Sequence, residues 1–147
     1  MNMKKSFLFI VIMSLVLCAC TPATQPRQAQ SSFICASAQS CAVVSNRLIT
    51  ADRGSVKCFD LSGNVEFERE LEQADAVISA SGDNAAAYCV GGKTVVLSSG
   101  DTIETENDIT SVSASESGMT AVCTLCAGYE GLVTVYSPDA EPVYRWY

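Results

Sequence analysis

Two cysteines near the end of the sequence have the spacing of a thiol-redox pair, because Cys123-Thr-Leu-Cys126 is a Cys-x-x-Cys motif. In redox proteins this motif normally lies at a helix N-terminus, where the helix dipole lowers the pKa of one thiol. Here the surrounding residues follow a strand pattern, and residues three apart on a strand point to opposite faces, which prevents a disulfide unless the strand bends. We therefore interpret Cys123 and Cys126 as small packing residues and keep a redox role as the alternative.

The sequence contains eight cysteines, and six of them lie in the body of the chain. Six cysteines allow fifteen disulfide pairings, and spacing alone does not select one. Cys89 and Cys123 end two similar Ala/Val-rich segments, as an apolar packing residue would, so we expect mostly free, buried thiols. The six residues are Cys35, Cys41, Cys58, Cys89, Cys123 and Cys126.

Four carboxylates, Glu66, Glu68, Glu70 and Glu72, occupy alternate positions and would share one face of a strand. Paired carboxylates can bind calcium or act as a general acid and base. Like charges at this spacing also form an ordinary solvated face that keeps an outer strand from aggregating, which is the interpretation that we favour.

The segment Gly91-Gly92-Lys93-Thr94 is similar to the end of a phosphate-binding loop. The full motif needs a glycine five residues before Gly92, where this chain has Ala87, and it must open a helix. We therefore predict a hairpin turn between two strands here.

The 147 residues include no histidine, which excludes Ser-His-Asp triads, Cys-His dyads and His-ligated zinc. The net charge is −7 and no basic patch is present, so we expect no nucleic-acid partner. Hydrophobic residues make up 48% of the chain, enough to fold around a core. We assign no metal site and no cofactor.

The N-terminus has the pattern of a targeting segment. Lys4 and Lys5 precede an apolar run from Phe7 to Cys18, which suits a secretory signal helix better than a membrane span. The run ends Leu17-Cys18-Ala19-Cys20, which resembles a bacterial lipobox. We predict a signal peptide over 1–19, lipidation of Cys20, and localisation at the extracytoplasmic face of the cell membrane. Plain secretion after cleavage near Ala19 and an uncleaved anchor are the alternatives.

Residues 20–31 are polar and include two of the four prolines, so we expect a flexible tether. From residue 32 onward the chain reads as a repeat. Glycines at Gly54, Gly92 and Gly131 each precede a short apolar segment and a turn, and Ile78-Ser-Ala-Ser81 matches Val112-Ser-Ala-Ser115. The repeat predicts three units of four short strands, over about 32–72, 73–107 and 108–147. In the first unit we expect strands over 32–38, 41–51, 55–60 and 64–70.

Four strands at a period near 40 are typical of a propeller blade. The pattern of Ser-x-Ser, polar turn, small strand, Gly and Val-x-Val-Tyr resembles WD-type and quinoprotein-type repeats, and an uncharacterised family of bacterial envelope propeller proteins. The resemblance covers about residues 32–147, although the Trp-Asp dipeptide of true WD repeats is absent. It implies an all-β, β-propeller-like fold after the signal helix and no catalytic residue.

Three blades are fewer than the four or more that usually close a propeller. We favour an incomplete propeller, the N-terminal fragment of a longer protein. The alternatives are a dimer that completes a six-blade ring and a sheet stack that is not a propeller. Open sheet edges could mediate self-association.

The function expected from these features is non-catalytic binding or scaffolding of a protein, peptide or glycan at the membrane. Aromatic residues concentrate near the C-terminus, where they serve either binding or packing between blades. One alternative is a propeller enzyme whose site lies in further blades, and another is a thiol-redox protein that uses Cys123 and Cys126. The aromatic residues are Tyr129, Tyr136, Tyr144, Trp146 and Tyr147.

Overall fold

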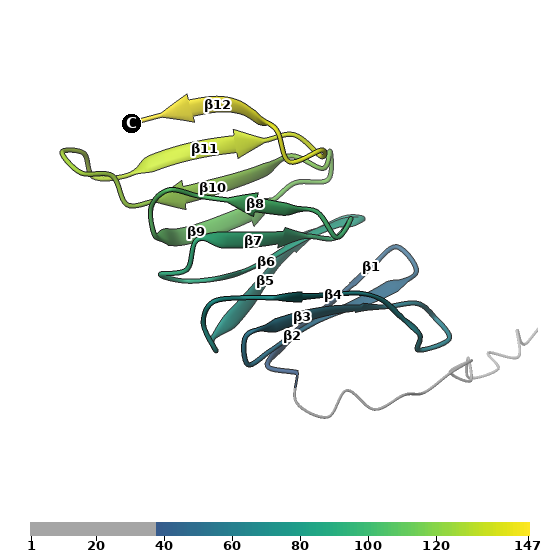
Figure 1. The fold of residues 1–147 in the computed structure, drawn as a ribbon. Helices are drawn as coiled ribbons and strands as arrows, with labels where there is room; N and C mark the ends of the chain where they lie inside the picture. The colour runs from purple at the N-terminus through teal and green to yellow at the C-terminus, as the bar shows by residue number, and fades with distance from the viewer. Residues whose placement is uncertain (1–37) are drawn as a thin grey trace, which may run out of the picture. The chain divides into compact units, whose positions relative to one another are not determined.

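The structure, a computed structural model, describes residues 38–147 (Figure 1). These residues form twelve strands and no helix, and the strands build three antiparallel sheets of four strands each. Within each sheet, strands that follow one another in the sequence pair with one another. The all-β prediction is therefore confirmed for this part of the chain, and the three sheets do not close into a ring.

The strands follow the order of the repeat. The first sheet contains β1 (Ser40–Val44), β2 (Arg47–Asp52), β3 (Ser55–Phe59) and β4 (Val65–Glu70). The second sheet contains β5 (Ala76–Ser81), β6 (Asn84–Cys89), β7 (Thr94–Leu97) and β8 (Thr102–Glu104). The third sheet contains β9 (Ile109–Ala114), β10 (Thr120–Thr124), β11 (Leu132–Tyr136) and β12 (Pro142–Trp146).

One predicted strand was wrong. The segment 41–51, expected as a single strand, is a hairpin in which β1 and β2 pair across a turn at Ser45 and Asn46. Ser45 adopts a φ of 52°, a left-handed conformation that reverses the chain. The segment contains no glycine or proline, the usual signals of a turn, so the apolar residues on both sides read as one run.

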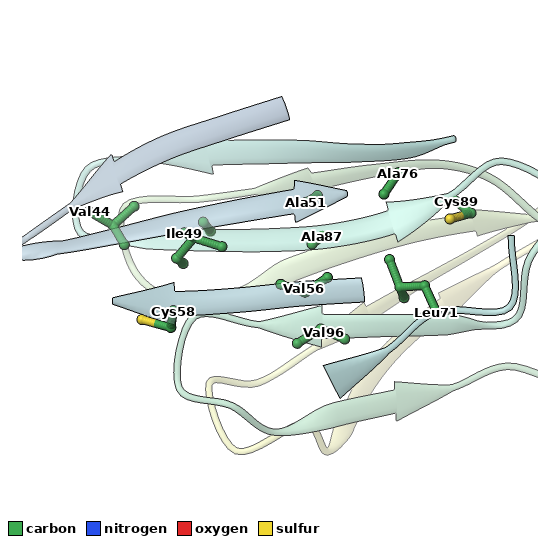
Figure 2. Packing of buried hydrophobic residues seen from close by; sticks show 11 residues of the cluster. Val44, Ile49, Ala51, Val56, Cys58, Leu71, Ala76, Ala87, Cys89 and Val96 are labelled. Atoms are coloured by element: carbon green, nitrogen blue, oxygen red, sulfur yellow. The ribbon is translucent and has the colours of Figure 1, made fainter. Parts of the chain in front are cut away.

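The core consists of two apolar clusters, one in each space between neighbouring sheets. Figure 2 shows the cluster between the first and second sheets, where Ile49, Val56 and Cys58 pack against Ala87 and Val96. All five side chains are buried. Neighbouring residues on a strand point to opposite faces of the sheet. Alternate residues of the second sheet therefore pack against the first sheet and against the third. The residues of the second sheet that pack against the third are Ala86, Tyr88, Val95, Leu97 and Ile103.

The sheets converge at their first strands. β1 lies against β5 and β5 lies against β9, whereas no comparable backbone approach joins β4, β8 and β12 among the described strands. Figure 1 shows the same three sheets splaying from one another toward these fourth strands. Spaces between neighbouring sheets are therefore widest near the fourth strands.

The paired registers correct the predicted equivalence of Cys89 and Cys123. In the third sheet Val112 pairs with Val122, and in the second sheet the equivalent residue Ile78 pairs with Ala87. Val122 therefore corresponds to Ala87, and Cys123, the residue after Val122, corresponds to Tyr88. Cys89 is buried in the cluster between the first and second sheets, whereas Cys123 lies on the face of the third sheet that points away from the second. A slip of one residue moves a side chain to the opposite face of its sheet.

The glycine repeat needs the same correction. In the registers, Val56, Val95 and Val133 are the equivalent third-strand residues, because they pair with Ala51, Tyr88 and Cys123. Gly54 and Gly131 each lie two residues before their valine, whereas Gly92 lies three before Val95. Because the turns before these strands differ in length, the glycines do not lie at one fixed distance before the equivalent strand residues.

Several predictions fall on residues outside the described part of the chain. They are the signal peptide over 1–19, the lipidated Cys20, the tether over 20–31, Cys35 and nearly all of the strand expected at 32–38. Within residues 38–147, no helix has the length and apolar character needed to cross a membrane.

Candidate binding clefts between the second and third sheets

Two clefts meet at the loop that connects the second sheet to the third. The larger has a volume of about 410 Å³ and the smaller about 120 Å³, and Glu106 and Asn107 of the β8–β9 loop line both. The smaller cleft extends between β8 and the outer strands of the third sheet, where Glu104 and Arg145 face the same space. The larger cleft is lined by Lys93, Glu106, Asn107, Asp108, Leu125, Cys126, Ala127, Tyr129 and Glu130.

Backbone hydrogen bonds hold the walls of these clefts. The amide and hydroxyl groups of Thr105 both donate to the carbonyl oxygen of Lys93, at 2.8 and 2.9 Å. The amide of Leu125 donates to the carbonyl oxygen of Asp108 at 2.9 Å. The backbone of the β8–β9 loop is therefore tied to both sheets, so little backbone ordering is needed when a ligand binds.

The larger cleft is acidic. The exposed carboxylates of Glu106, Asp108 and Glu130 line it together with a single cation, Lys93. Tyr129 adds an aromatic ring that is 61% exposed and lies 5.1 Å from the ring of Tyr147. Carboxylates beside an exposed aromatic ring favour a ligand that carries a positive charge.

The sequence did not single out the acidic residues of this cleft. Glu106 and Asp108 lie in the β8–β9 loop and Glu130 lies in the β10–β11 loop, and no spaced motif includes any of the three. The only signal was their position in loops between strands, where binding residues often lie. Of the predicted aromatic residues, Tyr129 lines the larger cleft, and Tyr136 lies at the smaller one.

Cys123 and Cys126, interpreted above as packing residues with a redox pair as the alternative, are two free, half-buried thiols. Cys123 is on β10, and Cys126 lies in the loop that follows it and lines the larger cleft. No described residue near them belongs to a helix, so no helix dipole acts on either thiol. Cys41, Cys58 and Cys89 are free as well.

The four predicted carboxylates do not share one face, which corrects that expectation. A register shift after Cys58 turns Glu66 inward, where its Oε2 accepts a hydrogen bond from the Cys58 thiol at 3.6 Å and lies 3.7 Å from Arg47 Nη1. Glu68 instead pairs with Lys57 at 2.9 Å. Glu70, the last residue of β4, is exposed, as are Glu66 and Glu68.

Glu72 lies beyond the end of β4 and anchors the turn before β7. Its carboxylate accepts hydrogen bonds from the amide of Lys93 at 2.5 Å and from the hydroxyl of Thr94 at 3.1 Å. Gly91 and Gly92 lie between β6 and β7, so the predicted hairpin turn at this segment is confirmed. No group of three or more His, Cys, Asp or Glu residues within 38–147 is arranged to hold a metal ion.

Comparisons with known proteins place the fold but name no activity. The computationally designed Ika8 protein, known from a crystal structure, is similar with a TM-score of 0.50 at 14% sequence identity. The similarity covers 74% of this chain and 36% of the designed chain, so this chain spans about a third of that protein's length. No curated protein matches the sequence. A family model matches residues 26–146, and the chain belongs to that family, the family of unknown function DUF5711.

Proposed function

We propose that this protein is a non-catalytic binding module that recognises a positively charged segment of a partner protein or peptide. The observation that carries the proposal is the larger cleft, where three exposed carboxylates and Tyr129 surround a space of about 410 Å³. Carboxylates attract a lysine or arginine side chain, and the tyrosine ring can add a cation–π contact. Because backbone hydrogen bonds fix the cleft walls, little ordering is needed on binding.

We further infer that the three sheets are blades of a propeller-like assembly. The convergence of β1, β5 and β9 and the splaying of the fourth strands support this reading, because blades are arranged radially in the same way. The clefts then lie between two neighbouring blades. Loops between blades are common binding positions in folds built on a rigid scaffold.

We also propose that a lipid on Cys20 holds the module at the extracytoplasmic face of the cell membrane. The support is the lipobox-like Leu17-Cys18-Ala19-Cys20 after an apolar run. A Cys20→Ala variant expressed in a bacterial host should leave the membrane fraction, and the wild-type N-terminal peptide should carry the added mass of acyl chains. A wild-type peptide without acyl chains would refute this part of the proposal.

The binding proposal is tested by calorimetric titration of the full-length protein in detergent with a hexalysine peptide. Neutralising the cleft with Glu106→Gln, Asp108→Asn and Glu130→Gln should weaken binding roughly fivefold, at about 0.3 kcal/mol for each exposed ion pair. A matched variant removes three exposed carboxylates elsewhere: Asp83→Asn, Glu116→Gln and Glu141→Gln. If both variants weaken binding equally, the peptide senses only net charge and the cleft is not the site.

A further inference from the structure

The outer face of the third sheet, which points away from the second sheet, is apolar. Two rows of paired residues cross this face, and neither row contains a charged side chain. Their β12 members, Tyr144 and Trp146, are 58% and 55% exposed and stack with ring centroids 5.7 Å apart. The rows are Ser111–Cys123–Val133–Trp146 and Ser113–Ala121–Val135–Tyr144.

The same register positions are sheet-to-sheet contacts in the other two sheets. In the second sheet the equivalents of Cys123 and Val133 are Tyr88 and Val95, which are buried against the third sheet. In the first sheet the equivalents are Ala51 and Val56, which are buried against the second sheet. These positions therefore pack against the next sheet in the first and second sheets. In the third sheet the same positions lie on the outer face.

The first sheet carries the complementary surface. A row of four apolar residues crosses its outer face, and the β1 and β4 members, Val43 and Val65, are 73% and 51% exposed. A second row, Cys41–Thr50–Lys57, occupies the register of Ile78–Ala87–Val96, through which the second sheet packs against the first. This row continues to Glu68, so the Lys57–Glu68 ion pair lies on the same face at its β4 side. The apolar row is Val43–Leu48–Phe59–Val65.

We propose that the third sheet of one copy packs against the first sheet of a second copy. Both contacts form at once in a two-fold symmetric dimer, so two copies with three sheets each make a ring of six sheets. Propellers of four to eight blades close, so six sheets suit a closed ring. The partner is a second copy because the interface repeats the sheet-to-sheet contacts already present within the chain. Packing through faces replaces the edge-to-edge association expected from the sequence.

The dimer brings a natural cysteine pair together. Tyr88 and Val112 belong to one apolar cluster between the second and third sheets. Tyr88 of the second sheet corresponds to Cys123 of the third. Val112 corresponds to Ile78 of the second sheet and to Cys41 of the first, because Cys41 pairs with Thr50 as Ile78 pairs with Ala87. The equivalent pair across the new interface is therefore Cys123 of one copy and Cys41 of the other. Cys41 is exposed and Cys123 is half-buried in the single chain. A short thiol-reactive cross-linker should therefore join them between copies.

The test uses the full-length protein in mild detergent, with native mass spectrometry and cross-linking by a short bismaleimide. We expect a dimer and a cross-linked peptide pair that contains Cys41 and Cys123. Cys41→Ser or Cys123→Ser should remove that peptide pair while the native mass remains that of the dimer. Val133→Glu with Val135→Glu should give a monomer, whereas Ser117→Glu, in an exposed turn of the same sheet, should leave the dimer intact.

A monomer of the wild-type protein at micromolar concentration, with Cys41 and Cys123 alkylated freely, would overturn the proposal. So would a dimer cross-linked only through Cys123 to Cys123, because that product requires two third sheets to face each other. The cross-link in the wild-type protein keeps the test valid if the Val133 and Val135 double variant does not fold. The hexalysine cleft lies within one copy, so the binding proposal can fail or succeed independently of the dimer.

Discussion

Nη1 of Arg47 donates a hydrogen bond of 3.0 Å to the carbonyl oxygen of Ser98, a residue 51 positions further along the chain. Arg47 opens β2 and Ser98 follows β7, so this bond joins the first sheet to the second. Nε of Arg69 donates in the same way to the carbonyl oxygen of Gly100 at 3.2 Å. Two arginines of the first sheet therefore bind carbonyl groups of one turn, which fixes how these sheets sit on each other at the rim of their apolar cluster.

Replacing Arg47 by alanine should lower the free energy of unfolding by about 1–2 kcal/mol, because a hydrogen bond from a charged group is lost and its carbonyl acceptor is left without this donor. Urea denaturation followed by circular dichroism measures the change. Lys93→Ala is the control, since it removes the same charge from an exposed loop. Equal effects of the two variants would mean that Arg47 acts only through net charge.

Asn84 joins the second sheet to the third. Its Nδ2 donates to the carbonyl oxygens of Ser115 and Glu116, at 3.2 and 3.0 Å. Asn84→Ala should lower the free energy of unfolding by about 1 kcal/mol. Asn84→Asp should cost more at pH 7, because it turns a negative carboxylate toward two carbonyl oxygens.

The difference in free energy of unfolding between Asn84→Ala and Asn84→Asp should depend on pH. Protonation of the introduced carboxyl group supplies a donor again, so the excess cost of Asn84→Asp should shrink as the pH falls below about 4. Asp83→Asn, in the same exposed turn, controls for charge at this position. If Asn84→Ala and Asn84→Asp unfold alike at pH 7, the two hydrogen bonds do not hold the sheets together.

The strand pattern could be predicted from the sequence because it depends on local chemistry. The strand predicted over 55–60 is β3 (Ser55–Phe59) to within one residue, since Gly54 precedes it and a polar turn that contains Gly63 follows it. The hairpin turn at Ser45 and Asn46 was missed because it is short and contains no glycine or proline, although serine and asparagine both favour turns. Local patterns therefore identified strands where glycine, proline or a longer polar segment separated them.

Register and side-chain direction could not be predicted, because both depend on which strand lies beside which. The register shift after Cys58 turns Glu66 away from Glu68, and nothing local in the sequence marks it. The positions of Cys89 and Cys123 on opposite faces also depend on pairing. The acidic cleft combines residues of two loops, so it exists only once the second and third sheets have packed.

A matched pair of glycines tests the packing of turns in the third sheet. Gly118 and Gly128 have nearly the same positive φ, 84° and 85°, so alanine should strain both by a similar amount, about 1 kcal/mol. A Cβ at Gly118 would lie 2.9 Å from Cγ of Pro138, whereas a Cβ at Gly128 would meet no atom within 4 Å. Gly118→Ala should therefore lower the free energy of unfolding by about 1–3 kcal/mol more than Gly128→Ala. Equal losses in thermal unfolding would show that the turn at Gly118 moves aside without cost.

The thiol of Cys58 should make the stability depend on pH in the alkaline range. Burial raises its pKa from the ordinary 9.0 to about 11, Arg47 opposes the rise, and the hydrogen bond to Glu66 adds to it. The folded thiol keeps its proton where the unfolded thiol loses it, so this contribution to stability is complete below pH 9 and is lost as the pH rises to about 11. The free energy of unfolding should therefore fall more steeply between these values in the wild-type protein than in Cys58→Ala.

The control for this prediction is Val56→Ala, another truncation in the same apolar cluster. It should lower stability at every pH through the cavity that it leaves, while the slope between pH 9 and 11 stays that of the wild-type protein. Urea unfolding at pH 8, 9, 10 and 11 gives the three slopes. If Cys58→Ala and the wild-type protein have the same slope, the Cys58 thiol loses its proton equally readily in the folded and unfolded chain, and burial does not protect it.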